Sequence, residues 1–182
     1  MPVTLDTSSS IPGGSTVLNY EFKRDLDTYF ATLPPNAPMR SLDEVIAHND
    51  ANARVALKFG QGRALASQAL DISPGSADTA RYHADRAQDL ADSRDRIDTV
   101  MAEHDLTALL FAGAGSAAIG AKAGYPSITV PAGYQAANRR PFNITLLGRA
   151  WSEPTLIGYA HDYEQAAQAR RPPSEINPTL FG

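Results

Sequence analysis

The chain has 182 residues, of which 43% are hydrophobic and 20% charged, a composition typical of one globular domain. Its 16 basic and 20 acidic residues give a net charge of −4 and form no basic stripe, which argues against a nucleic-acid-binding protein. The absence of cysteine excludes disulfides, thiolate metal sites and a cysteine nucleophile.

Residues 1–16 are predicted to form a flexible leader, because residues 7–16 are rich in turn formers and poor in apolar side chains. The leader has neither the basic region nor the apolar core of a secretory signal, so we expect a cytoplasmic protein. The longest apolar stretch, residues 106–119, is interrupted by glycines and falls short of the ~20 residues that span a membrane. No membrane association is therefore expected.

Helical spacing of apolar residues predicts a first helix from residue 17 to Pro34, with one face formed by a set of large side chains. That set is Leu18, Phe22, Leu26, Tyr29, Phe30 and Leu33. Ser41 and Glu44 form a capping box that should start a second helix, predicted to reach residue 60. Asn49 lies on its apolar stripe and is expected to hydrogen-bond a neighbouring loop.

A short helix is expected over residues 63–70, and a long one from Ser76 to about residue 104. The long helix has a narrow, alanine-rich stripe that suits close packing. Its other face is densely charged and is predicted to be solvated, including Asp92 and Asp95. These acids are given no catalytic role.

Apolar runs predict strands over residues 107–111, 127–130 and 141–147, the last two joined as a hairpin. Ser152 should cap a last helix, with Pro154 in its first turn. Tyr125 and Trp151 are expected to be core anchors. The whole pattern indicates an α/β fold with one domain over residues 17–173 and a tail over residues 174–182.

Two motifs carry a family resemblance: Ala-Gly-Tyr-Pro-Ser-Ile-Thr-Val-Pro-Ala-Gly at 123–133 and Gly-Arg-Ala-Trp-Ser-Glu-Pro-Thr-Leu at 148–156. They resemble the C-terminal part of amidase-signature enzymes, which cut amide bonds with a Ser–cis-Ser–Lys triad. Segments 17–23, 43–49 and 163–166 follow in the order of that family. The resemblance implies the C-terminal part of the amidase-signature fold, a small mixed sheet flanked by helices, and an amide substrate.

The family's catalytic lysine and its Gly/Ser-rich nucleophile loop belong to its N-terminal half, and the chain shows no counterpart of either. Gly13-Gly14-Ser15 superficially resembles that loop, but the second serine and the trailing glycines are missing, so it is interpreted as a linker. We therefore expect no catalytic residue in this chain and no activity from the chain alone.

A dyad of Lys122 with Ser116 is the remaining candidate for nucleophilic chemistry, because a catalytic lysine must be buried beside its serine. The other lysines, Lys23 and Lys58, have charged neighbours and are expected to be solvated. The family places its base elsewhere, and the dyad is therefore rejected.

The resemblance implies that the loop containing Gly113, Gly115, Ser116 and Ile119 borders the substrate pocket, where small residues permit a close approach of the backbone. The alternative is a tight strand-to-helix turn in which Ser116 is an N-cap, and both can hold. The four histidines are scattered without ligand spacing, so neither a metal nor another cofactor is expected.

Two functions stay open. The chain is either a component of an amidase, active on a small amide when an N-terminal half supplies the triad, or a non-catalytic binding or interaction protein derived from one. An unpaired edge strand would favour a partner or self-association in both cases.

Overall fold

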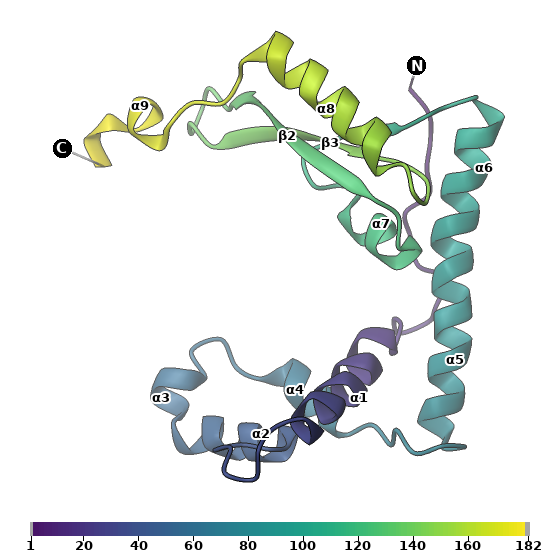
Figure 1. The fold of residues 1–182 in the computed structure, drawn as a ribbon, viewed down its shortest axis with the longest axis vertical. Helices are drawn as coiled ribbons and strands as arrows, with labels where there is room; N and C mark the ends of the chain where they lie inside the picture. The colour runs from purple at the N-terminus through teal and green to yellow at the C-terminus, as the bar shows by residue number, and fades with distance from the viewer. Residues whose placement is uncertain (1, 181–182) are drawn as a thin grey trace. The chain divides into compact units, whose positions relative to one another are not determined.

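The computed structural model describes residues 2–180 and divides them into two compact units (Figure 1). A helical unit contains residues 10–88, and a sheet unit contains residues 2–9 together with residues 89–180. The expected leader is thus shared between the two units, and Val3 and Leu5 pack against the core of the sheet unit. The expected boundaries at residues 16 and 173 stay predictions.

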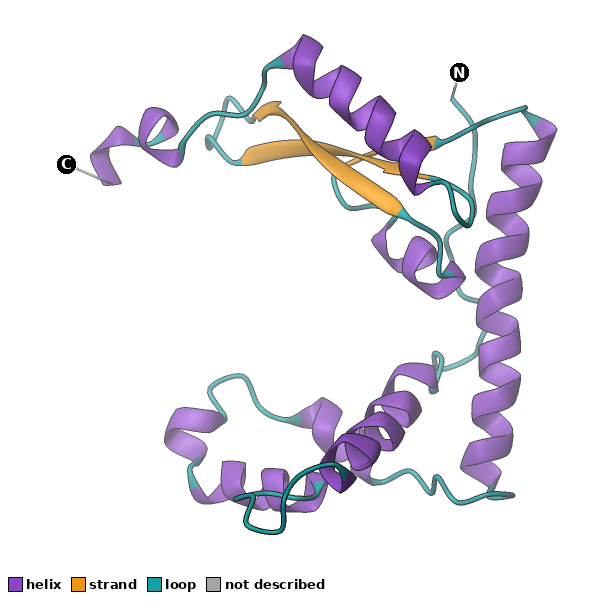
Figure 2. Ribbon diagram, viewed as in Figure 1, coloured by secondary structure: helices purple, strands orange, loops and turns teal. Residues whose placement is uncertain are grey.

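The helical unit contains α1 (Val17–Ala31), α2 (Leu42–Ala51), α3 (Ala53–Ala56), α4 (Gly62–Gln68) and most of α5 (Ala77–Leu90), as Figure 2 shows. The helix expected up to residue 60 is interrupted at Asn52. The Asn52 side-chain amide donates to the carbonyl of His48 at 2.8 Å. A side chain that competes for a helical carbonyl in this way favours a helix end.

The apolar face predicted for α1 is wrong in part. Leu18, Phe22 and Tyr29 are 62%, 46% and 57% exposed, whereas Tyr20 is buried. The Tyr20 ring stacks on Tyr82 of α5 with ring centroids 4.1 Å apart, and its hydroxyl lies 2.8 Å from that of Thr79. The helix therefore turns an aromatic ring with a satisfied hydroxyl toward its neighbour, which apolar periodicity does not register.

The Ser41 capping box is confirmed, with a small difference. The Ser41 hydroxyl accepts from the amide of Glu44 at 3.1 Å, while the Glu44 carboxylate accepts from the amide of Arg40. Asn49 also behaves as expected, because its side chain donates to Gln61 in the loop before α4 at 3.1 Å.

Replacing Ser41 by alanine is expected to destabilise the helical unit by about 1 kcal/mol, because the N-cap acceptor of α2 is lost. Thermal denaturation followed by circular dichroism measures the change. Ser174→Ala, an exposed serine in the short helix α9 (Pro173–Ile176), serves as the control and should leave the melting temperature unchanged. Equal effects of the two substitutions would contradict the capping role.

The prediction of a solvated acidic face on the long helix is wrong for Asp85, Asp89 and Asp92, which are 7%, 4% and 5% exposed. The amide and hydroxyl of Thr16 both donate to Asp85, at 2.8 and 2.7 Å. Burial by itself raises the pKa of Asp85, but these bonds and Arg81 outweigh it and lower the pKa below its usual range.

Residues 77–103 are helical throughout, with a π-helical turn, η1 (Ala91–Asp95), between α5 and α6 (Arg96–Glu103). In this turn the buried Ser93 hydroxyl donates to the carbonyl of Asp89 at 2.6 Å. Asp92 pairs with Arg96 at 2.9 Å, and Asp95 is exposed as predicted. The acids of this helix are therefore buried where a cation or hydroxyl reaches them.

The sheet unit is built on three antiparallel strands in the order β1-β3-β2: β1 (Leu109–Ala112), β3 (Pro141–Leu147) and β2 (Ser127–Tyr134). The expected α/β class and the hairpin are confirmed. The sheet was expected to be mixed, but each pairing within residues 2–180 is antiparallel. For β2 and β3 the reason is local, because a short connection favours an antiparallel pair, whereas a parallel pair needs a long crossover.

Helices cover both faces of this sheet (Figure 1). One face contributes Leu109 and Leu147 to the core cluster, together with side chains of α6 and of α7 (Ala117–Ala123). Strand neighbours point to opposite faces, so Leu146 and Val130 lie on the other face, which α8 (Glu153–Ala167) covers. The chain ends in α9 and the turn η2 (Pro178–Leu180).

Trp151 is not the core anchor that was expected, because 89% of it is exposed. Its φ of +64°, in the turn before α8, is rare for a bulky side chain. Ser152 occupies the N-cap as predicted, yet its hydroxyl donates to the Arg149 carbonyl at 2.7 Å instead of capping α8. Within residues 2–180, each helix is too short or too polar to cross a membrane.

Candidate functional site

The turn from β1 to α7 holds the residues predicted to bind substrate. Gly113 follows β1 directly with a φ of +65°, a conformation that glycine adopts without a steric cost. The Gly113 amide donates to the backbone carbonyl of Asn143 at 2.8 Å, and the Gly113 carbonyl accepts from the Thr145 hydroxyl at 2.7 Å. Both bonds fix the start of the turn on the central strand β3.

Gly115 is exposed in the same turn. A Cβ at this position would lie 3.8 Å from the Ala112 carbonyl oxygen and from the Phe111 ring, which is ordinary contact. Packing therefore does not demand a glycine here. What the glycine provides is open backbone at the end of β1.

Ser116 and Ile119 are buried, with exposed fractions of 0% and 4%. Ser116 occupies the N-cap of α7, which fits the structural alternative, but its hydroxyl makes no hydrogen bond within residues 2–180. Ile119 belongs to the core cluster. Of the predicted substrate contacts, Gly113 and Gly115 reach the surface, and the assignment of all four stays a prediction.

Lys122 is engaged in an ion pair. Its ammonium lies 2.6 Å from the carboxylate of Asp89, which is 4% exposed. The Lys122 side chain is thus directed to a carboxylate, whereas the dyad requires it beside the serine hydroxyl that it would deprotonate. The geometry therefore agrees with rejecting the dyad of Lys122 with Ser116.

Lys23 is not solvated as predicted, because it donates to the carbonyls of Gln68 and Leu70 at 2.9 and 2.7 Å. These carbonyls lie at the C-terminal end of α4, where a cation is favoured by the helix dipole. Lys58 is exposed, as predicted. The lysines of the chain thus have structural or solvated positions.

The first sequence motif is attached to the long helix by two polar contacts. Arg94 donates to the carbonyl of Ala123 at 2.6 Å, and the Tyr125 hydroxyl donates to Asp98 at 2.8 Å. Burial, followed by the bond to Asp98, raises the pKa of Tyr125 above its ordinary value. Tyr125 also packs against the core cluster, which supports its predicted role as an anchor.

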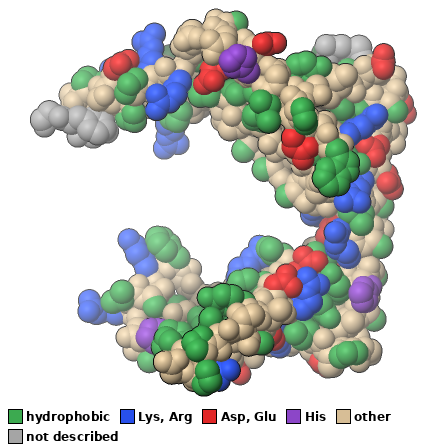
Figure 3. All heavy atoms as spheres, in the orientation of Figure 1, with side chains coloured by type: hydrophobic (Ala, Val, Ile, Leu, Met, Phe, Trp, Pro, Cys, Tyr) green, Lys and Arg blue, Asp and Glu red, His purple; other side chains and the backbone are tan. Residues whose placement is uncertain are grey.

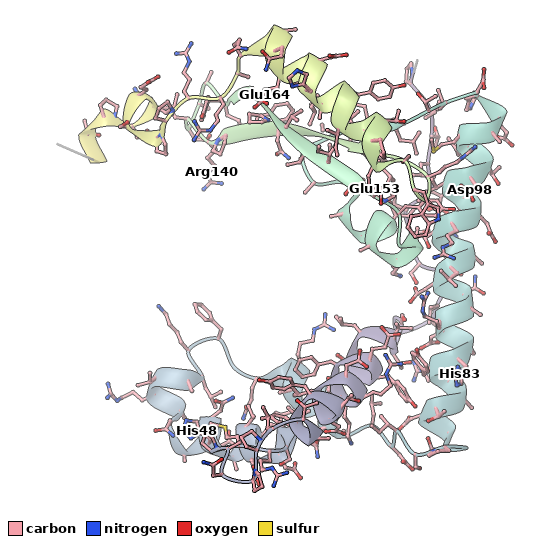
Figure 4. The ribbon with its side chains drawn as sticks, viewed as in Figure 1. His48, His83, Asp98, Arg140, Glu153 and Glu164 are labelled. Carbon is pink, nitrogen blue, oxygen red and sulfur yellow. The ribbon has the colours of Figure 1, made fainter. Side chains whose placement is uncertain are left out.

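The second motif also contacts Asp98, which Figure 4 labels. Arg149 donates to the Asp98 carbonyl at 3.1 Å, and its Nε lies 3.5 Å from an Asp98 carboxylate oxygen. Sequence reasoning missed Asp98 and Arg94 because the charged face of the helix was predicted to be solvated. Their spacing of one helical turn was the available signal. Both motifs are therefore structural anchors on the helix next to the loop.

Residues 2–180 contain no group of three or more His, Asp or Glu side chains that could hold a metal ion. On the face shown in Figure 3, basic and acidic side chains are interspersed on each unit, with apolar side chains between them. The described part of the chain therefore offers a small-residue loop on a rigid sheet, but no assembled set of catalytic groups.

The known proteins to which this chain is similar include amidases. No family model matches the sequence. A probable amidase of Arabidopsis thaliana is 34% identical over 166 residues, which is 90% of this chain and 31% of that protein. A putative amidase of Schizosaccharomyces pombe is 45% identical over 53 residues, which is 29% of this chain and 9% of that protein.

Solved structures agree. The native peptide amidase of Stenotrophomonas maltophilia has a TM-score of 0.77 and 36% identity, covering 87% of this chain and 34% of that one. An amidase family protein of Bacillus anthracis has a TM-score of 0.82 and 27% identity, covering 94% of this chain and 32% of that one. Fold and sequence thus place the chain among amidase-family proteins. The chain is similar to part of an amidase, and it spans about a third of the length of these relatives.

Proposed function

We propose that this chain is the C-terminal portion of an amide-bond hydrolase, inactive alone and active when a complementary portion supplies the nucleophile and its base. The observation that carries the proposal is the asymmetry of the matches. They cover 90% of this chain but 31% of the curated relative, and 87% of this chain but 34% of the solved peptide amidase.

The chemistry within the described residues supports this proposal. Amide cleavage through a serine requires a hydroxyl, a neutral base and oxyanion donors within hydrogen-bonding reach. Ser116 is wholly buried, Lys122 is paired with Asp89, and Lys23 donates to two carbonyls. None of them is positioned as an accessible nucleophile or a neutral base.

In this proposal the chain contributes one wall of the substrate site. Gly115 presents open backbone in the turn after β1, and the bonds of Gly113 to β3 hold the start of that turn in place. A small amide substrate is the expected ligand, with its reacting carbonyl placed by the complementary portion. The proposal requires no metal or other cofactor.

The alternative is a non-catalytic interaction protein derived from an amidase. The observation in its favour is the exposure of large apolar side chains, with Trp151 89% and Phe59 92% exposed. Exposed tryptophan is frequent at the centre of protein interfaces. An interaction protein and an enzyme component differ in turnover, so an assay separates them.

The test is hydrolysis of an aryl amide and an aryl ester by the purified chain, alone and coexpressed with a complement. As complement we choose the part of the Stenotrophomonas peptide amidase outside the matched region. The chain alone should show background hydrolysis, unchanged by Ser15→Ala or Ser116→Ala, and the complement should restore turnover. Turnover by the chain alone that Ser116→Ala abolishes would contradict the proposal. A stable but inactive complex would favour the interaction protein.

A further inference from the structure

The two edges of the small sheet differ in their free backbone groups. In the β1–β3 pair, Gly113 donates to Asn143, directly opposite it in the register. Residues alternate along an antiparallel ladder, so Leu109 and Phe111 also direct their backbone groups toward β3. Leu110 and Ala112 therefore direct their N–H and C=O groups to the outer edge, where residues 2–180 provide no further strand.

The outer edge of β2 is poorly suited to pairing. Gly148 donates to Pro126 at 3.0 Å, which sets the alternation so that Ser127, Thr129 and Pro131 face outward. Pro131 has no N–H to donate, and the register shifts between Pro131 and Gly133. Proline and irregular pairing are features that block the addition of a strand to a sheet edge.

The edge of β1 has none of these protections. Its four residues, Leu-Leu-Phe-Ala, contain no charge, no proline and no register shift. Leu110 is 63% exposed, on the face opposite to the buried Leu109. A cavity of about 680 Å³ lies beside this strand. It is lined by Leu109, Leu110 and Phe111 of β1, by Leu106, and by the leader residues Val3 and Leu5. There is both an unpaired ladder and space next to it.

The length of the relatives indicates what occupies this edge. About two thirds of each solved relative lies outside the region that this chain matches. The loop with Gly113 and Gly115 directly follows β1, so a strand paired with β1 would end or begin beside the proposed substrate wall. A second copy of this chain would bring no new chemistry to that loop.

We propose that β1 is the docking edge for the complementary amidase portion, which adds an extended strand by pairing with the backbone of Leu110 and Ala112. The edge of β2 stays unpaired in the assembly. This inference rests on the proposed function and specifies which surface of the chain the complement recognises. Main-chain hydrogen bonds of this kind provide affinity, and the exposed Leu110 side chain provides contact area.

The test uses the coexpressed complex with the complement defined above. Leu110→Lys places a charge at the docking edge and should weaken the complex at least about tenfold, as loss of a central contact does. Ala112→Lys should act in the same direction. Ile157→Lys is the matched control, because Ile157 lies on α8 and is 58% exposed, close to the 63% of Leu110. Circular dichroism confirms that each variant is folded.

Amide hydrogen exchange provides an independent measurement. On complex formation the amides of Leu110 and Ala112 should become protected, while those of Ser127 and Thr129 exchange as before. Protection at Ser127 and Thr129 alone would overturn the docking edge. So would a dimer of the chain in sedimentation whose Leu110 and Ala112 amides are protected without the complement.

The outcomes separate this inference from the proposed function. A complex that restores turnover and tolerates Leu110→Lys refutes the docking edge and leaves the function standing. A complex that depends on Leu110 but shows no turnover supports the docking edge and refutes the function. If no complex forms with the folded chain, both are refuted.

Discussion

Replacing Leu147 by alanine is expected to lower the free energy of unfolding of the sheet unit by about 3 kcal/mol. Leu147 is 0% exposed and joins β3 to the core cluster of Ile97, Met101, Leu109, Ile119 and Ala123. The substitution removes buried methyl groups and leaves a cavity that the surrounding strands and helices cannot fully close. Urea denaturation followed by circular dichroism measures the loss.

Leu110→Ala is the matched control, because Leu110 lies on the same sheet but is 63% exposed. Its effect should stay within about 0.5 kcal/mol.

A second check uses Gly120, whose added Cβ would lie 3.0 Å from the Leu147 side chain. Gly120→Ala should destabilise the natural chain and do so less in the Leu147→Ala background. Equal costs for Leu147→Ala and Leu110→Ala would show that the core is misplaced.

Replacing Lys122 by methionine is expected to destabilise the sheet unit by about 2 kcal/mol, because the buried carboxylate of Asp89 loses its ion pair with the Lys122 ammonium. The side chain of Lys122 is 34% exposed, so solvent reduces the effect below that of a fully buried pair. Methionine keeps most of the apolar stem, and the loss therefore reports the charge. Denaturation of the purified variant measures it.

Lys58→Met is the control, since Lys58 is exposed in the helical unit and should change stability little. In a double-mutant cycle, Lys122→Met and Asp89→Asn together should cost less than the sum of the two single changes. Turnover of the complemented enzyme, corrected for the folded fraction, should be unaffected by Lys122→Met. Loss of turnover without loss of stability would restore Lys122 as a candidate base.

Several elements of this fold were predicted correctly because they depend on interactions between residues that are close in the sequence. The Ser41 cap, the hairpin between β2 and β3, and the proline in the first turn of α8 depend on neighbouring residues and are confirmed. The family resemblance was also contained in short motifs, and the amidase relatives confirm it.

The candidate site was only partly predictable. The family resemblance implied that the loop after β1 borders a pocket, but Ser116 and Ile119, expected at that pocket, are buried. Burial depends on which face of α7 meets the sheet, and a helix of this length shows too little periodicity to decide it. Whether the four residues contact a substrate stays a prediction.

By itself, the sequence determined the α/β class, the order of the elements and the resemblance to amidases, because these follow from local patterns and motifs. Tertiary structure alone decided which polar groups are buried. Asp89 lies on the charged face that was predicted to be solvated, yet it is 4% exposed, and Lys122 reaches it from a segment distant in sequence. Asp98 stays about half exposed, and Tyr125 and Arg149 contact it from distant segments as well. A buried charge requires a partner in space, and spacing along one helix cannot reveal that partner.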